Sequence, residues 1–398
     1  MPDSVLGDDH RFTYFIGEPA ERITPQNLQW RAALPLSRQA QPGPSKPGTT
    51  TCGDYFTAAA DFLSRNDLAL PRKALAEPLG RRPGCEEIHQ IRVHLVKHGA
   101  FYHPARVTVA ANESAVALTL NVAVSGRGCE CLPREIANLA HLYDHYPRHF
   151  VPCCYGAGEG RTPSGGCLPM FATQWLSRFY EVHPSRGQGS RPLHWSVWDP
   201  DHGLWWLSPS QADAFFSQAA FILSYYFDPL TLSTVQAWHH AAGDFVVRNT
   251  GKSIDVRLIT VRQYRPFIAL ADDDPIDLAV LLDTLTLFLL RTSLWMRIDR
   301  LDGVGDLVWA HDRYLVPIWQ GFIRGVSAMA GRNGLPAEFV QGVVQYLAAH
   351  PPGALHDLGI QILSQQPGGR PETELIRENL RKHCKLLAAA VAHGLPPM

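Results

Sequence analysis

The sequence has little net charge and little charge of any kind. Its 398 residues contain 36 lysines and arginines and 37 aspartates and glutamates, so the formal charge is −1. A chain with this balance has no overall positive field, and we therefore expect binding neither to nucleic acid nor to an anionic membrane surface. Charged residues make up only 18% of the chain and hydrophobic residues 45%, which is typical of a globular rather than a disordered protein.

Long hydrophobic runs are also missing. The longest apolar stretch, residues 278–290, is too short to span a bilayer and contains Asp283, so it is predicted to be a buried helix. The N-terminal residues MPDSVLGDDHRF include acidic side chains and no apolar core, which is unlike a secretory signal. We therefore expect a cytoplasmic protein.

Cysteine is too sparse for a disulfide scaffold, with eight residues in a chain of this length. No C-x-x-C pair occurs, although five cysteines lie close together in the sequence: Cys129, Cys131, Cys153, Cys154 and Cys167. Reduced, mostly buried thiols are the interpretation that we favour. A zinc site completed by thiolates from two loops is the alternative.

The first 84 residues are predicted to form an N-terminal extension. They contain a Pro/Gly/Ser-rich linker, LPLSRQAQPGPSKPGTTT, and then a short helix candidate at residues 54–65 with its aromatic side chains on one broad face. We expect the extension to pack on the body of the protein or to offer a surface to a protein partner.

Residues 85–182 have the pattern of a small β-rich domain. Alternating apolar and polar residues predict three strands at 88–99, 105–111 and 115–125, and a helix at 132–147 follows with Pro133 in its first turn. Two further strands are expected before residue 182. This order predicts an antiparallel meander with one helix.

Residues 183–398 are predicted to be mainly helical. An aromatic hairpin containing Trp195, Trp198, Trp205 and Trp206 comes first and is expected to be packed. A helix capped by Ser208 or Ser210 follows. Further helices are expected at residues 278–296, 314–330, 337–349 and 372–393. Together the two regions predict an α+β protein.

The most informative segment is WHHAAGDFVVRNTGKSIDVR, residues 238–257. A Gly-Asp pair follows two histidines, Asn249 lies five residues after Asp244, and a short hairpin leads to Asp255. This spacing resembles the catalytic segment of the protein-kinase-like superfamily, especially its aminoglycoside phosphotransferase-like branch. The resemblance covers about residues 85–340. It implies a two-lobed fold, with a small antiparallel β lobe at 85–182 and a mainly helical lobe at 183–398.

The resemblance also implies Mg²⁺ and ATP as cofactors and a small-molecule hydroxyl as the acceptor. Asp244 would orient that hydroxyl, and Asn249 and Asp255 would hold the metal. A turn-capping role for Asp244 and a hairpin role for Asn249 are the structural alternatives. The chain departs from the family because Asp255 follows Asn249 by only six residues. Where the metal-binding aspartate would otherwise fall, the sequence has Arg262 and Arg265.

The β lobe departs from the family as well. Glu135, early in the predicted helix, matches the glutamate that pairs with a lysine on the third strand, but that strand reads VALTLNVAVS and has no lysine. Asn121 is the polar residue near its end. Lys97 could approach the phosphates from a neighbouring strand, although a surface lysine at a hairpin is the interpretation that we favour. In the resemblance, the backbone near Trp175 meets the adenine.

The sequence also predicts roles for several other polar residues. Glu181 and His183 would flank the entrance of the cleft. A buried, hydrogen-bonded role is favoured for His239 and His240, because the family histidine would fall at Ala242. A solvated ion network is predicted for four charges of alternating sign: Arg297, Asp299, Arg300 and Asp302.

Three functions stay open. The first is an ATP-dependent phosphotransferase acting on a small-molecule hydroxyl. The second is a catalytically inactive pseudokinase that serves as a binding or scaffold module, which the missing lysine and the short spacing from Asn249 to Asp255 favour. The third is a nucleotidyl (AMP) transferase with the same fold.

Overall fold

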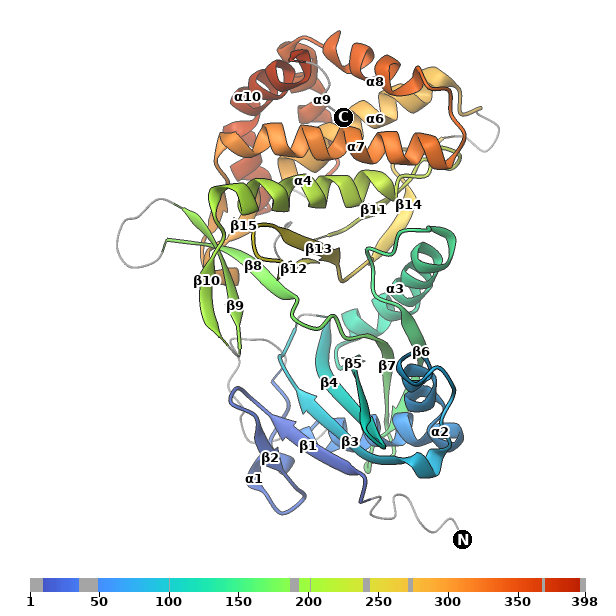
Figure 1. The fold of residues 1–398 in the computed structure, drawn as a ribbon. Helices are drawn as coiled ribbons and strands as arrows, with labels where there is room; N and C mark the ends of the chain where they lie inside the picture. Colours follow the sequence, from blue (N-terminus) through green and yellow to red (C-terminus); the bar gives the residue numbers. More distant parts are fainter. Residues whose placement is uncertain are drawn as a thin grey trace. The chain divides into compact units, whose positions relative to one another are not determined.

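The computed structural model describes residues 10–35, 49–99, 101–186, 193–200, 202–238, 244–270, 275–366 and 369–393. Figure 1 traces the chain, which divides into two compact units. The first unit comprises Met1–Asp144 and Pro152–Ser177, and the second comprises His145–Val151 and Arg178–Met398. Each unit combines antiparallel strands with helices. The expected α+β class is therefore confirmed.

A seven-stranded sheet with the order β2-β1-β3-β4-β5-β7-β6 forms the first unit. β1 is parallel to β3, and the other neighbouring strands are antiparallel. The strands are β1 (Phe12–Ile16), β2 (Glu21–Ile23), β3 (Ile88–Leu95), β4 (Tyr102–Ala111), β5 (Ser114–Ala123), β6 (Cys154–Arg161) and β7 (Cys167–Gln174). The predicted meander corresponds to β3, β4 and β5.

The helical segments of this unit are α1 (Leu28–Arg31), α2 (Cys52–Leu79), the 3-10 turn η1 (Cys85–Glu87) and α3 (Gly126–His145). α2 is longer than the predicted helix. Its N-terminus is stabilised by a capping box, in which the Thr51 hydroxyl accepts from the Asp54 N–H and the Asp54 carboxylate accepts from the Thr51 N–H. Left-handed backbone at residues 66–68 interrupts it.

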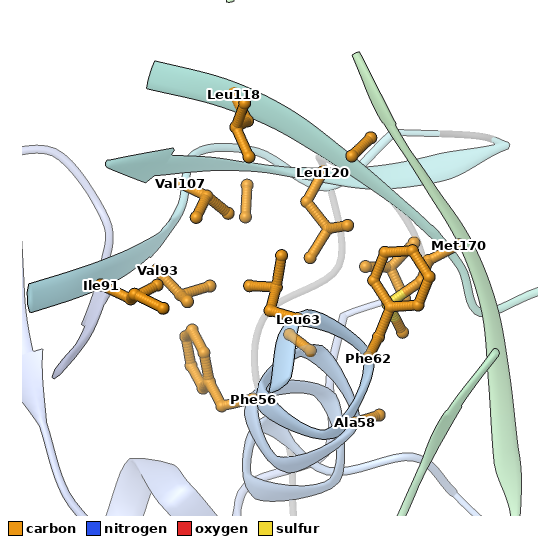
Figure 2. Close-up of a cluster of buried hydrophobic side chains, with 14 of the residues drawn as sticks. Phe56, Ala58, Phe62, Leu63, Ile91, Val93, Val107, Leu118, Leu120 and Met170 are labelled. Carbon is orange, nitrogen blue, oxygen red and sulfur yellow. The ribbon is translucent and has the colours of Figure 1, made fainter. Parts of the chain in front are cut away.

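The core of the first unit lies between α2 and the sheet. Phe56, Phe62 and Leu63 project from α2 toward the strands (Figure 2). They meet a layer of buried strand residues that includes Ile91, Val93, Val107, Leu118, Leu120 and Met170. The region expected as an N-terminal extension therefore packs on the body of the protein, and it does so as part of the main core.

The second unit contains a five-stranded sheet with the order β10-β9-β8-β12-β13 and two two-stranded sheets, β11-β14 and β15-β16. Its strands are β8 (Tyr180–Ser185), β9 (His194–Asp199), β10 (Gly203–Trp206), β11 (Ser233–Gln236), β12 (Phe245–Asn249), β13 (Ile254–Leu258), β14 (Gln263–Pro266), β15 (Ile298–Arg300) and β16 (Leu307–Trp309). The segment with the kinase-like spacing is thus the β12–β13 hairpin and the residues around it.

The helices of the second unit follow the expected order, with one addition. They are α4 (Pro209–Tyr225), α6 (Leu278–Trp295), α7 (Leu315–Arg332), α8 (Phe339–Ala348), α9 (Pro352–Ser364) and α10 (Pro371–Ala392), with 3-10 turns η2 (Leu301–Gly303) and η3 (Asp312–Tyr314). Ser208 caps α4 together with Gln211. α9 was not predicted. Among the described helices, α6 is long and apolar enough to cross a membrane, but 56% of it is buried in the protein, as in a core helix.

The aromatic hairpin β9–β10 packs through one face only. Trp195 is buried against Phe215 and Phe216 of α4. Trp198 and Trp206 are 59% and 42% exposed. The expected packed hairpin is therefore correct for Trp195 and wrong for these two, because side chains of alternate strand residues point to opposite faces.

Candidate functional site

Asp244 immediately precedes β12 and is buried, with 2% of its surface exposed. Its carbonyl oxygen accepts a hydrogen bond from the Ile259 N–H at 3.0 Å, which fixes it at one end of the β12–β13 ladder. Its carboxylate meets the guanidinium of Arg262 at two points. Nη1 donates to Oδ2 at 2.9 Å and Nη2 donates to Oδ1 at 2.8 Å.

The pair between Arg262 and Asp244 has the parallel, two-point geometry that makes guanidinium–carboxylate contacts strong and directional. The side chain of Arg262 is 13% exposed and also donates to the carbonyl of Ala237 at 3.2 Å. Because a guanidinium keeps its proton at any physiological pH, Asp244 has a permanent cation on both oxygens. Arg262 stands where the kinase-like pattern would place a metal-binding aspartate.

Asn249 lies at the other end of β12, in an exposed turn. Its side-chain oxygen accepts a hydrogen bond from the Gly251 N–H at 2.8 Å, so this oxygen stabilises the turn. Gly251 has a φ of +92°, which suits glycine at this tight reversal. The structure therefore supports the hairpin role of Asn249.

Asp255 lies in the middle of the hairpin on β13, directly opposite Arg248. Arg248 donates to one carboxylate oxygen at 2.9 Å, and Arg257 donates to the other. Asp255 is thus held between two guanidinium groups on the surface of the hairpin.

The three residues expected to converge on Mg²⁺ do not meet. With about 3.3 Å of strand per residue, Asn249 is about 13 Å from Phe245, the residue that follows Asp244, and Arg248, which faces Asp255, is about 10 Å from Phe245. A magnesium ion binds its oxygen ligands at about 2.1 Å, so no single ion can contact these groups. This corrects the expectation for Asn249 and Asp255: the segment between the acidic residues is extended strand rather than a compact loop.

Glu135 lies on α3 in the first unit and is 1% exposed. The hydroxyl of Tyr102 donates to its Oε2 at 2.8 Å, and the Cys131 thiol lies 3.9 Å from the same oxygen. Burial, together with the adjacent Glu135, raises the pKa of Tyr102. Glu135 is therefore hydrogen-bonded to a tyrosine at the start of β4, a partner that no local sequence pattern indicates.

The other residues assigned to nucleotide binding have ordinary structural surroundings. Asn121 lies on β5 between Pro104 of β4 and Phe171 of β7. Lys97 follows the end of β3 and is half-buried. Trp175 stacks with the guanidinium of Arg106, and its N–H donates to the carbonyl of Ala117 at 3.3 Å. That backbone donor of the expected hinge is therefore already used within the first unit.

A second buried carboxylate, Asp299 on β15, lies near Asp244 in the second unit. Burial raises the pKa of Asp299 to about 7, and its charge interacts with those of His183, Glu181 and Asp244. Its Oδ1 accepts from the Arg300 N–H at 2.7 Å, whereas its buried Oδ2 has no hydrogen-bond partner within the described part of the chain. His183 Nε2 lies 3.2 Å from Glu181 Oε2.

The structure corrects the predicted solvated ion network for Arg297 and Asp299, whereas Asp302 is exposed as expected and Arg300 is partly exposed. Asp299 is 4% exposed and Arg297 is 1% exposed. Arg297 donates to the carbonyl of Ala310 and to the carboxylate of Asp312 at 2.6 Å. Alternating charge at the end of a helix usually indicates an exposed surface. β15 is too short, at three residues, for its sequence to show a pattern of burial.

All eight cysteines are free thiols. Burial raises the pKa of Cys153 and of Cys154. In the part of the chain that the structure describes, no group of three or more histidine, cysteine or acidic residues is placed to hold a metal ion. His239 and His240 lie outside the described residues.

Comparison with known proteins identifies no family for this chain. No family model matches the sequence, and no curated protein matches it. Among solved structures, a chain described as "WaaP in complex with acyl carrier protein" is similar to 61% of this chain and to 85% of its own length, with 10% sequence identity and a TM-score of 0.24.

Proposed function

We propose that this chain is a pseudokinase, a protein with a two-lobed kinase-like fold that binds a partner and transfers no phosphate. The observation that carries the proposal is the two-point ion pair between Arg262 and Asp244. In a kinase-like phosphotransferase, the carboxylate at this position accepts the hydrogen bond of the acceptor hydroxyl. Here both oxygens accept from a permanently charged, largely enclosed guanidinium, which occupies two of the carboxylate's four lone-pair positions and neutralises its charge.

The residues that were expected to hold the metal support the same proposal. Phosphoryl transfer relies on ions that bridge the phosphates and neutralise developing charge. The side-chain oxygen of Asn249 accepts a hydrogen bond within the hairpin turn, and the carboxylate of Asp255 lies between two arginines. These residues do not fit a magnesium site together with Asp244.

Glu135 adds a third argument from the first unit. In an active kinase-like site the glutamate of this helix pairs with the lysine that contacts the phosphates. The carboxylate of Glu135 instead accepts a hydrogen bond from the Tyr102 hydroxyl in a buried position. We place the resulting binding module in the cytoplasm, with a protein as its partner.

The rival is a Mg²⁺- and ATP-dependent transferase that modifies a small-molecule hydroxyl with phosphate or AMP. A thermal unfolding titration separates the two, because a ligand that binds the native state at about 100 times its dissociation constant stabilises it by about 2.7 kcal/mol. We expect the unfolding temperature to be the same with ATP alone and with ATP plus magnesium chloride.

Mass analysis of ATP incubations with a panel of sugars and amino sugars completes the test. We expect no phosphorylated or adenylylated product. A magnesium-dependent rise in unfolding temperature together with a product that disappears in the Asp244→Asn variant would overturn the pseudokinase proposal and establish the transferase.

A further inference from the structure

A groove of about 850 Å³ in the second unit lies along α4 and the start of α7. The two helices run side by side (Figure 1), and they approach so closely that a Cβ at Gly321 would lie 1.9 Å from the carbonyl oxygen of Ser217. Volumes of about 300–1,000 Å³ are typical of ligand sites. The residues that line this groove are outside the site around Asp244.

Arg324 of α7 gives the groove an oriented cation. Its Nη2 donates to the hydroxyl of Ser217 at 2.6 Å and its Nε donates to the carbonyl of Gln320 at 3.3 Å. Within the described ranges, no carboxylate lies in ion-pair distance of this guanidinium. The two hydrogen bonds hold the guanidinium in one orientation, and because Arg324 is exposed its charge is accessible to a ligand in the groove.

Arg313 and His311 extend the row of donors. The Nδ1 of His311 accepts from the Arg313 N–H at 3.1 Å, so in the neutral ring the proton lies on Nε2, which can donate to a ligand. Arg313 donates to Asp213 Oδ2 at 2.6 Å. α7 also begins here, and the positive end of its dipole favours an anion.

Asp213 adds a hydrogen-bond acceptor to the groove. Its Oδ1 is buried and has no hydrogen-bond partner among the residues that the structure describes. A buried acceptor without a partner costs about 1–3 kcal/mol, which a donor from a ligand would recover. Beside it, Val316 is 47% exposed and forms an apolar wall with Pro317.

We infer that this groove binds an acidic peptide segment of a partner protein. A side-chain carboxylate would bind Arg324 and Arg313, a backbone N–H would donate to Asp213 Oδ1, and an aliphatic side chain would pack on Val316. A free inorganic anion supplies only the first of these three contacts. The inference rests on the proposed binding function, because it names the chemistry of the partner.

Fluorescence anisotropy of the full chain tests the inference. The probe is a fluorescein-labelled octapeptide of glutamate, leucine and glycine, and its control replaces each glutamate with glutamine. We expect saturable binding of the glutamate peptide and binding weaker by about tenfold or more for the glutamine peptide, which corresponds to about 1.4 kcal/mol. Added salt should weaken only the former.

Charge reversal locates the site. We expect Arg324→Glu to weaken binding of the glutamate peptide by about tenfold or more, and the milder Arg324→Gln to weaken it less. Arg381→Glu, at an exposed position of α10, serves as the matched control and should bind as the unmodified chain does. Unfolding temperatures of all three variants show that they are folded.

Absence of binding, equal binding of the two peptides, or equal loss in the control variant would overturn the inference. Binding is measured without nucleotide, so the result is independent of the transferase assay. A chain that binds the peptide and also transfers phosphate would overturn only the pseudokinase proposal. A chain that does neither would overturn only the peptide site.

Discussion

Arg262 and Asp244 are each needed to keep the other buried. Taking a charged group out of water costs several kcal/mol, and in this pair the two parallel hydrogen bonds offset that cost. Loss of either partner would remove both of these hydrogen bonds from a charge in a nearly buried position. The pair is therefore a structural contact, and the Arg262 guanidinium neutralises the carboxylate that would have to orient an acceptor hydroxyl.

Asp299 makes the stability of the protein depend on pH near neutrality. Burial raises its pKa from 3.8 to about 7, so the folded chain keeps the proton at pH values at which the unfolded chain has lost it. When the folded state binds more protons than the unfolded state, stability falls as pH rises. The fall should begin above the unfolded pKa, near 4, and end as pH passes the folded pKa, near 7.

Asp299→Asn tests this dependence, because asparagine resembles the neutral acid and does not titrate. The full effect is on the order of 4 kcal/mol, from about three pKa units at 1.36 kcal/mol each. We expect the variant to be more stable than the unmodified chain at about pH 8 and similar to it near pH 4, as measured by urea unfolding.

The exposed Asp306→Asn is the control for the loss of a carboxylate near β15. It should change stability little at either pH. A variant Asp299→Asn with the same pH dependence as the unmodified chain would show that Asp299 is ionised in the folded protein.

The roles of Asp244, Asn249 and Arg262 could be predicted only as far as local sequence patterns indicate them. The spacing from Asp244 to Asn249 was visible in the sequence, but spacing measures distance along the chain and not in space. Five residues span about 17 Å in a strand and far less in a loop, so the β12 conformation decided whether a metal site formed. The contact between Arg262 and Asp244 joins residues 18 apart and needed the fold of the whole hairpin.

At the level of elements, α4 and α7 approach closely because glycine stands where they meet. A Cβ at Gly321 would lie 1.9 Å from the Ser217 carbonyl oxygen, and one at Gly325 would lie 2.7 Å from that of Phe221. These two oxygens are backbone atoms, and the Ser224 Cβ, 2.6 Å from a Cβ at Gly325, is attached directly to the backbone, so none of them can rotate away as the end of a flexible side chain can. Close packing of this kind leaves no room for an added methyl group.

Gly321→Ala should therefore destabilise the protein by about 1–3 kcal/mol, since overpacking forces the two helices apart. Gly342→Ala on α8 is the matched control, because no atom outside its own helix lies within 4 Å of the added Cβ. There alanine should stabilise the helix by about 0.5–1 kcal/mol. Chemical denaturation of both variants measures the difference, and two effects of the same sign would contradict the packing argument.

Elements with strong local signals were predictable, and short ones were not. α4 has a Ser208 cap and a long apolar face, and the meander of β3 to β5 has clear alternation. β15 and β16 contain three residues each, too few for a period to emerge. Such strands form because a partner strand completes their hydrogen bonds, which sequence patterns do not report.

At the level of the whole molecule, the N-terminal region could not be placed from sequence. The Pro/Gly/Ser-rich segment suggested that residues 1–84 were separate from the β-rich domain. The residues that they contact are distant along the chain. Tyr14 of β1 lies beside Val93 of β3 in a parallel pair, a pairing that needs a long crossover. The aromatic face of α2 was visible, but its partners on β3, β5 and β7 were not.

Removal of this region should abolish folding of the first unit. A chain that begins at residue 85 lacks β1, β2 and α2, and with them Tyr55, Phe56 and Leu63, none of which is measurably exposed. Each buried aromatic or aliphatic side chain contributes about 1.5–3 kcal/mol. Loss of only these three approaches the 5–15 kcal/mol that typically separates folded from unfolded states.

We expect the chain that begins at residue 85 to aggregate or to lose strand signal in circular dichroism, whereas a chain that begins at His10 keeps every described element and should unfold as the full chain does. Because α2 covers the apolar face of β3 to β5, the shorter chain would expose that face to water. A soluble monomer with the full strand signal and a cooperative transition would mean that the sheet is stable without α2, and that residues 1–84 are an appendage to the first unit rather than half of its core.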